Sequence, residues 1–348
     1  MTYEYEKVPT PSTGLRLHLN ENTAGCSPKV LEALRALTRT DVSFYPGYDA
    51  EIDACATALR VAPEQLVLTN GLDEGILAIT IAAHRERGST VPEAIVVVPA
   101  FDMYASTAAG VGARIVEVPP GRDFAFPVDR ILAAITPNTR LLFLTSPNNP
   151  TGLSIPKEDV LRIARQAPHI RILVDEAYAD FAQVTLIGDE EIGDLPNIFI
   201  GRTFAKAYGL AGVRAGAVIG EAGALAAIRR VVPPFSLNIC ATVALAAGLA
   251  DTPYYEWYLG QVRASKALLY EALGKAGVRF WPSDANFVLA DFGACAGAVV
   301  AGLAARGVYV RDKSRDPACP GCVRITTGVV DHTRTCIAAL EEVLCGEA

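Results

Sequence analysis

The residues with the clearest chemical potential lie within residues 202–214. In this stretch Lys206 is surrounded by small and apolar residues, and Arg214 follows it along the chain. A lysine amine attacks a carbonyl group only in its neutral form, and partial desolvation favours that form by lowering the lysine pKa. A lone lysine in such a stretch can equally be a surface residue in a loop. The lysine therefore predicts Schiff-base chemistry only if other residues supply a binding site around it.

Other polar stretches come directly after short apolar segments that are typical of buried strands. They are residues 71–73, 146–152 and 175–178. The lysine stretch itself follows another such segment, residues 197–200. Ligands of open parallel sheets bind at the carboxyl ends of the strands. If the sheet is parallel, all of these stretches lie along one edge and can converge on one ligand.

The elements around these stretches alternate between helix and strand from about residue 50 to residue 220. Most of the strand segments are continuous apolar runs, which is typical of strands covered on both faces. This pattern predicts an α/β fold with a mainly parallel central sheet. Residues 233–235, Pro-Pro-Phe, interrupt the pattern, and a smaller α+β unit is expected after them. We predict an N-terminal segment (1–40) that packs with the small domain, a large domain (41–240) and a small domain (241–348).

Composition excludes several classes of partner. The chain has 348 residues, of which 51% are hydrophobic, and a net charge of −7, so a nucleic-acid partner is not expected. No apolar run is long enough to span a membrane, and the first residues do not resemble a signal peptide, which predicts a cytoplasmic location. Cys319 and Cys322 have the spacing of a redox or zinc motif, but no second such pair accompanies them. We therefore expect reduced thiols and no metal site.

Several stretches, taken together, resemble the fold-type I aminotransferases that use pyridoxal phosphate, and more narrowly the histidinol-phosphate aminotransferase family. They are residues 19–22 (Leu-Asn-Glu-Asn), 45–46, 71–75, 146–152, 175–178 (Asp-Glu-Ala-Tyr), 206–214, 310–312 and 323–328. They extend over nearly the whole chain. The resemblance implies a large domain that binds the cofactor and a homodimer with shared active sites.

The resemblance also implies a role for each matching residue around the cofactor. Lys206 would bind the cofactor covalently and move a proton at the substrate carbon. Asp175 would keep the pyridine nitrogen protonated, since an adjacent carboxylate stabilises that positive charge. Tyr178 and Asn149 would hydrogen-bond the ring oxygen, and Phe101 would stack on the ring. Core packing is the alternative for Phe101, and turn formation is the alternative for Asp175 and Asn149.

The cofactor phosphate would be held by a cup of backbone and side-chain donors: Gly71, Leu72, Asp73, Thr203 and Arg214. A helix start and an arginine suit a phosphate group. Relatives often have a hydroxyl residue immediately before the lysine, whereas this chain has Ala205. One phosphate contact of the family is therefore expected to be missing or replaced by water.

Three further residues resemble the family's substrate-binding positions: Tyr45, Arg311 and Arg324. The planar fork of arginine suits both carboxylates and phosphates. Arg324 would take the carboxylate of glutamate or the phosphate of the other substrate, and Arg311 the second anionic group. The alternative for Arg311 is a solvated cluster of charges with its neighbours Asp312 and Lys313. Tyr45 would reach the substrate phosphate in the site of the neighbouring subunit, and Asn149 would also face substrate.

The function implied by the resemblance is transamination between histidinol phosphate and 2-oxoglutarate, with glutamate as the amino donor of the reverse direction. Two other activities on the same fold stay open: an aromatic amino-acid aminotransferase and a threonine-phosphate decarboxylase-like enzyme. A remote alternative is a protein that binds pyridoxal phosphate without turnover. A complete set of Lys206, Asp175, Tyr178 and Arg214 argues against that alternative.

Overall fold

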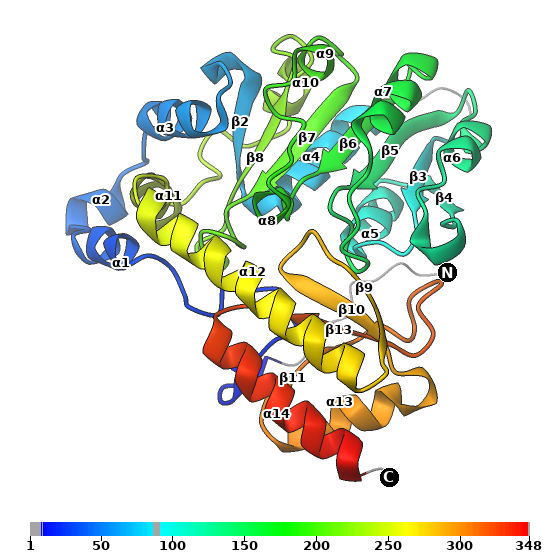
Figure 1. Ribbon diagram of the computed structural model, residues 1–348. Helices are drawn as coiled ribbons and strands as arrows, with labels where there is room; N and C mark the ends of the chain where they lie inside the picture. Colours follow the sequence, from blue (N-terminus) through cyan, green and yellow to red (C-terminus); the bar gives the residue numbers. More distant parts are fainter. Residues whose placement is uncertain (1–7, 9, 86–90, 347–348) are drawn as a thin grey trace.

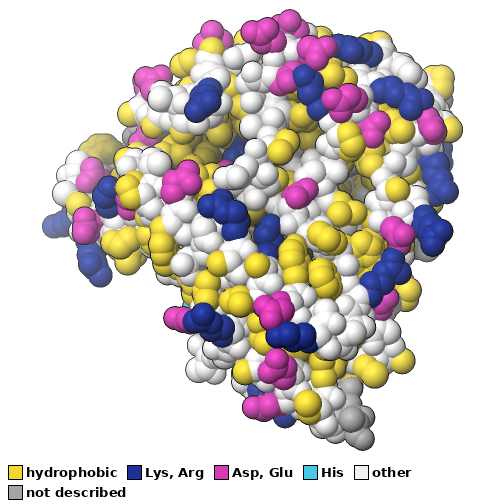
Figure 2. Space-filling model, in the orientation of Figure 1, with side chains coloured by type: hydrophobic (Ala, Val, Ile, Leu, Met, Phe, Trp, Pro, Cys, Tyr) yellow, Lys and Arg dark blue, Asp and Glu magenta, His cyan; other side chains and the backbone are white. Residues whose placement is uncertain are grey.

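The computed structural model describes residue 8 and residues 10–85 and 91–346 (Figure 1). The first residues, on which the expectation about a signal peptide depends, lie outside the described residues. No helix in the described part of the chain is long and apolar enough to cross a membrane. On the face drawn in Figure 2, acidic and basic side chains are interspersed.

Most of the chain is organised around a large sheet, which within the described residues has seven strands in the order β2-β8-β7-β6-β5-β3-β4. Its strands are β2 (Leu66–Asn70), β3 (Glu93–Val97), β4 (Arg114–Val118), β5 (Thr139–Thr145), β6 (Arg171–Asp175), β7 (Ile198–Thr203) and β8 (Ala215–Gly220). β8 is antiparallel to both of its neighbours, and the other strands point the same way. The prediction of a mainly parallel α/β sheet is thus confirmed.

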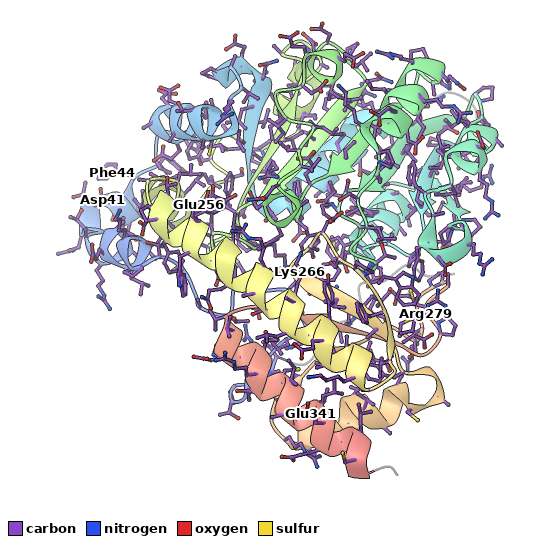
Figure 3. The ribbon with its side chains drawn as sticks, in the orientation of Figure 1. Asp41, Phe44, Glu256, Lys266, Arg279 and Glu341 are labelled. Carbon is purple, nitrogen blue, oxygen red and sulfur yellow. The ribbon has the colours of Figure 1, made fainter. Side chains whose placement is uncertain are left out.

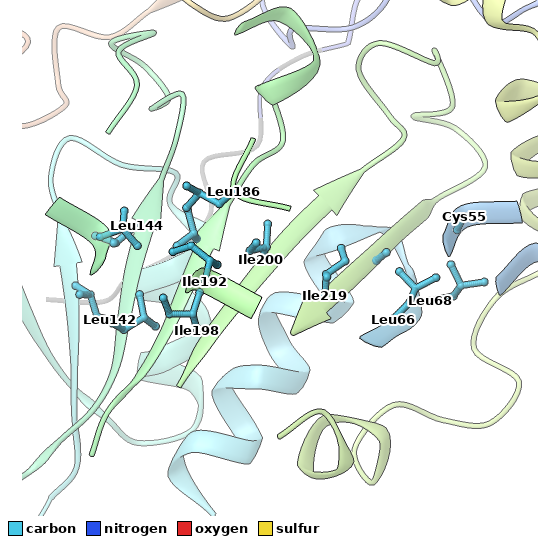
Figure 4. Close-up of a cluster of buried hydrophobic side chains, with 14 of the residues drawn as sticks. Cys55, Leu66, Leu68, Leu142, Leu144, Leu186, Ile192, Ile198, Ile200 and Ile219 are labelled. Atoms are coloured by element: carbon cyan, nitrogen blue, oxygen red, sulfur yellow. The ribbon is translucent and has the colours of Figure 1, made fainter. Parts of the chain in front are cut away.

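Helices cover both faces of this sheet (Figure 1). α4 (Gly71–His84), α5 (Met103–Gly110) and α10 (Ala226–Arg229) lie on one face, where Leu173 and Phe199 are buried. Ile172 and Ile198 point to the other face, because successive residues of a strand alternate. The core on that second face, part of which Figure 4 shows, also includes side chains of the elements α3 (Asp49–Leu59), α6 (Val128–Ala134), α7 (Lys157–Gln166), α9 (Glu190–Gly193) and α11 (Ile239–Leu249). Burial on both faces explains why the strands read as continuous apolar runs.

A smaller antiparallel sheet lies below the large one in Figure 1. In the described part of the chain its order is β12-β13-β10-β9. The strands are β9 (Arg279–Trp281), β10 (Phe287–Asp291), β12 (Arg311–Asp312) and β13 (Cys322–Thr326). Its core includes side chains of the helices α12 (Thr252–Lys275), α13 (Ala296–Ala305) and α14 (Val330–Gly346). This unit corresponds to the predicted α+β region after residues 233–235.

The N-terminal segment contacts both units. β1 (Leu15–Arg16) pairs with β11 (Val308–Tyr309) of the small unit, and Leu17 is buried in the core of that unit. Further on, Ser27 caps α1 (Pro28–Arg35) by accepting from the Lys29 N–H group, and Pro28 occupies the first helical position. α1 packs against α11, and Val30 belongs to the large core. The domain boundaries at residues 40 and 240 stay predictions.

The remaining short elements connect these layers. They are α2 (Arg39–Ser43), α8 (Ala179–Ala182), and the 3-10 turns η1 (Pro63–Gln65), η2 (Arg122–Phe124) and η3 (Gly293–Cys295). The long helix α12 runs diagonally from the large unit to the small one in Figure 1. It therefore bridges the two units, with contacts to α8 and α11 on one side and to β9, β10 and α14 on the other.

Candidate active site

The predicted site residues meet in a cavity of about 300 Å³ between the two units. The loops after β2, β5, β6 and β7 all reach it, because these strands point the same way and end at one edge of the sheet. The residues named from the sequence that line it are Leu72, Asp73, Phe101, Asn149, Asp175, Tyr178, Thr203, Lys206, Arg214, Arg311 and Arg324. Gly71 lies next to this group, and Tyr45 lies outside it.

Lys206 lies in the loop between β7 and β8, at the wall of the cavity. Its Nζ donates a hydrogen bond to the carbonyl of Leu19 (3.0 Å) and lies 5.9 Å from the ring centroid of Tyr178. Burial, followed by the positive charge of Arg324, lowers the pKa of Lys206 to about 8. A substantial fraction of the amine is therefore neutral just above neutral pH, which is the form that attacks a carbonyl carbon.

Asp175 is the last residue of β6 and is buried. Its Oδ1 accepts from the Ala177 N–H (2.8 Å), and its Oδ2 accepts from the hydroxyl of Tyr104 (2.6 Å). Burial raises the pKa of Asp175 to about 6, and these two hydrogen bonds oppose that rise. The carboxylate is therefore held in one orientation at the cavity wall, where a cationic group of a ligand would stabilise its charged form.

Two residues that were not predicted from the sequence hold this arrangement in place. Tyr104, on α5, is buried, donates to Asp175 and accepts from the Thr145 hydroxyl (2.9 Å). Asn20 donates its amide to the hydroxyl oxygen of Tyr178 (3.0 Å). Tyr104 follows Phe101 by three positions at the start of the helix after β3, so the spacing from Phe101 could have pointed to it.

The start of α4 forms one end of the cavity. Gly71 has a φ of +73°, a backbone conformation that favours glycine, and a Cβ placed there would lie 2.6 Å from Nη2 of Arg214. Arg214 Nη2 donates to Asp73 Oδ2 (2.6 Å), and the Thr203 hydroxyl accepts from the Ala205 N–H (3.2 Å). A guanidinium has five N–H donors, so the pair with Asp73 leaves others for an anion.

This end of the cavity fits the phosphate group of pyridoxal phosphate. Backbone N–H groups at a helix start and an adjacent arginine form an anion site. A buried carboxylate and a desolvated lysine lie along the same cavity, which matches the ring nitrogen and the aldehyde of that cofactor. Ala205 offers only its backbone N–H here, and Thr203 accepts it.

The small unit closes the cavity with arginines. β12 and β13 are antiparallel, and Arg311 lies directly opposite Arg324 in their register. Arg324 is buried, donates to the side-chain oxygen of Asn149 and to the carbonyl of His18, and lies 5.3 Å from the ring centroid of Phe287. The Asn149 oxygen is thus engaged, so its amide nitrogen is the group that can donate to a ligand.

Two features singled out from the sequence lie away from the cavity. Tyr45 is 79% exposed, and its ring stacks on that of Phe235 at a centroid distance of 4.3 Å. Cys319 and Cys322 are buried free thiols that pack with Leu289. Among the described residues, no group of three or more His, Cys, Asp or Glu side chains could hold a metal ion.

The family follows from comparison with known proteins. The model of the family "Aminotransferase class I and II" matches residues 12–339, so the chain belongs to that family and is a pyridoxal-phosphate-dependent aminotransferase. A histidinol-phosphate aminotransferase of Methanococcoides burtonii is 34% identical over 96% of this chain and 91% of its own length. Histidinol-phosphate aminotransferase 2 of Ralstonia nicotianae is 35% identical over 95% of this chain and 88% of its own. Within the class, the chain therefore belongs to the histidinol-phosphate aminotransferase family.

Solved structures agree with this placement. The crystal structure of histidinol-phosphate aminotransferase from Sinorhizobium meliloti in complex with pyridoxal-5'-phosphate has a TM-score of 0.86 to this chain. It is 28% identical, and the alignment covers 97% of this chain and 92% of that one. Aspartate aminotransferase from Thermus thermophilus, at 24% identity and a TM-score of 0.79, shares the fold. The expected fold type and cofactor are thus confirmed.

Proposed function

We propose that this chain transfers an amino group between histidinol phosphate and 2-oxoglutarate, which gives imidazole acetol phosphate and glutamate. The observation that carries the proposal is the pair Arg311 and Arg324, which lie opposite each other in the sheet register and line the same cavity as Lys206. Two arginines suit a cycle in which a dicarboxylate and a phosphate monoester use the cavity in turn. The names of the similar proteins support the same substrate.

The roles of the site residues are part of this proposal. Bound pyridoxal phosphate supplies a ring that withdraws electrons from the substrate carbon. Lys206 takes the proton from that carbon and returns it elsewhere on the same ligand, because its lowered pKa lets the amine act as a base. Asp175 holds the proton at the ring nitrogen, and Tyr178 and Asn149 orient the ring through its oxygen.

We also propose that two copies of the chain associate in the cytoplasm and share their active sites. Exposed apolar side chains gather on α2 and the segment after it, where Val42, Phe44 and Tyr45 are 68%, 71% and 79% exposed. Phe44 and Asp41 are labelled on this projecting corner in Figure 3. Large exposed apolar side chains that cluster favour a protein partner. A second copy is the partner that would place the Tyr45 hydroxyl near a substrate phosphate, since Tyr45 lies outside the cavity of its own chain.

A half-reaction tests the proposed activity. The enzyme loaded with pyridoxal phosphate is mixed with L-glutamate, and the cofactor absorbance and the released products are followed. We expect the absorbance of bound pyridoxal phosphate to disappear as an equal amount of 2-oxoglutarate is released, and imidazole acetol phosphate to restore it with formation of histidinol phosphate. Release of carbon dioxide would indicate a decarboxylase, and an unchanged spectrum would indicate binding without turnover. Either result contradicts the proposal.

A further inference from the structure

Lys313 directly follows β12 and lies on the same cavity-facing side as Arg311. β12 pairs with β13 through Arg311 and Arg324, and the Lys313 N–H donates to the carbonyl of Cys322 (2.9 Å), which continues the ladder by one residue. Alternate residues of a strand point to the same face. Arg311, Lys313 and Arg324 all line the cavity that holds Lys206. The small unit therefore brings three cationic side chains to one wall.

The surroundings of Lys313 differ from those of a solvated surface lysine. The residue is 7% exposed, and its Nζ forms an ion pair with Asp316 in the following turn. The Asp316 N–H in turn donates to the Lys313 carbonyl (2.9 Å). Lysines are rarely buried unless they are paired. The ammonium group has three N–H donors, so it can serve Asp316 and a phosphate oxygen together.

We propose that Lys313 is a phosphate-binding residue that forms, with Arg311, a subsite for the phosphate monoester of the substrate. This inference rests on the proposed function and specifies which residues select the phosphorylated substrate. A phosphate monoester carries a charge of about −2 near neutral pH, so two cations match it better than one. Arg324 already donates to the side chain of Asn149 and to the His18 carbonyl. In this scheme it binds one carboxylate of the dicarboxylate substrate.

Asp316 has a defined part in this subsite. It fixes the Lys313 side chain in the absence of substrate, and its negative charge repels the phosphate that the same ammonium group binds. Removing the charge of Asp316 should therefore strengthen phosphate binding, whereas removing the charge of Lys313 should weaken it. A merely structural pair would lose stability in both variants without a change in substrate preference.

The experiment compares a phosphorylated and an unphosphorylated substrate in the holoenzyme. For Lys313→Met, kcat/KM is measured with histidinol phosphate and with histidinol. We expect the ratio of the two values to fall about tenfold, which corresponds to ~1.4 kcal/mol. Lys313→Arg keeps the charge and should retain the ratio within about threefold. Lys275→Met, at an exposed lysine of α12 that pairs with Glu271, is the matched control.

Asp316→Asn should have the opposite effect on phosphate binding, and this test does not depend on whether Lys313→Met folds. Inorganic phosphate is used as a competitive inhibitor, and its inhibition constant should fall severalfold in Asp316→Asn and rise in Lys313→Met. Equal losses with both substrates, or an unchanged inhibition constant in both variants, would overturn the inference. If the unaltered enzyme shows no preference for histidinol phosphate over histidinol, the proposed function itself fails. A preference that survives in Lys313→Met overturns only the role of Lys313.

Discussion

The two walls of the cavity are built differently. The large-domain wall consists of residues at the ends of neighbouring parallel strands, and buried hydrogen bonds such as that between Tyr104 and Asp175 fix it. The small-domain wall consists of cationic side chains on the short paired strands β12 and β13. We infer that the first wall carries out the chemistry and the second selects the substrate. Variants of the first should thus change kcat, and variants of the second should change the preference among substrates.

The largest effect is expected for Lys206→Ala on the large-domain wall. Turnover should fall by about a thousandfold or more, since positioned proton transfer alone typically contributes about 10²–10⁴. Pyridoxal phosphate should still bind through Arg214 and the start of α4, but borohydride should no longer fix it to the chain. Steady-state assays and mass spectrometry after reduction measure the two outcomes. Substantial turnover by this variant would contradict the assignment of the lysine.

Asp175→Asn should lower kcat by about 10²–10³, because the charge that stabilises the ring nitrogen is lost. The same substitution should stabilise the folded apoprotein. Folding raises the pKa of this carboxyl from 3.8 to about 6, so burial of the charged form destabilises the apoprotein progressively as pH rises from about 4 to about 6. At pH 8 the apo variant should therefore be more stable, by about 2–3 kcal/mol.

Urea unfolding of the two apoproteins at pH 8 and near pH 4 measures this difference, which should shrink at the lower pH. Tyr104→Phe is a companion variant, because it removes a hydrogen bond that lowers the pKa of Asp175. The acid limb of its kcat profile should shift to higher pH. If Asp175→Asn keeps kcat within about threefold of the unaltered enzyme, Asp175 is only a turn residue.

A smaller effect is expected for Tyr45→Phe, outside both walls of the chain's own cavity. If its hydroxyl reaches the partner's substrate phosphate, the KM for histidinol phosphate should rise about fivefold, as for the loss of one hydrogen bond. Mixing this variant with Lys206→Ala chains should produce heterodimers in which one site combines Lys206 and Tyr45. Recovery of the low KM in the mixture supports a shared site. A monomer that is fully active at low concentration would contradict it.

The smallest effect concerns the phosphate end of the large-domain wall. Ala205→Ser should tighten the binding of pyridoxal phosphate by roughly 0.5–1.5 kcal/mol, if the new hydroxyl adds one hydrogen bond to the phosphate. Equilibrium dialysis of the cofactor measures it, with Ala205→Val as a control that adds bulk without a donor. An unchanged affinity would mean that water or the Thr203 hydroxyl already makes this hydrogen bond to the phosphate.

The difference between the two cavity walls also explains which features could be predicted from the sequence. Apolar runs followed by polar stretches indicated the strand ends and hence the convergence of Lys206 and Asp175. The antiparallel direction of β8 was not predicted, although the connection from β7 (residues 204–214) is short for a crossover to a parallel strand. Tyr104 was missed because an aromatic residue on a helix resembles core. The burial of Lys313 could not be predicted from the sequence. It depends on the β12–β13 register and on the turn at Asp316, which no local pattern encodes.

The most direct test of the two-wall account is the kcat/KM of the unaltered enzyme for histidinol phosphate against phenylalanine and tyrosine, with 2-oxoglutarate as the acceptor. We expect a preference for histidinol phosphate of at least about a hundredfold, because a cationic wall that lacks its phosphate is left with buried, unmatched charge. Equal or greater values for the aromatic amino acids would contradict it and would favour an aromatic amino-acid aminotransferase.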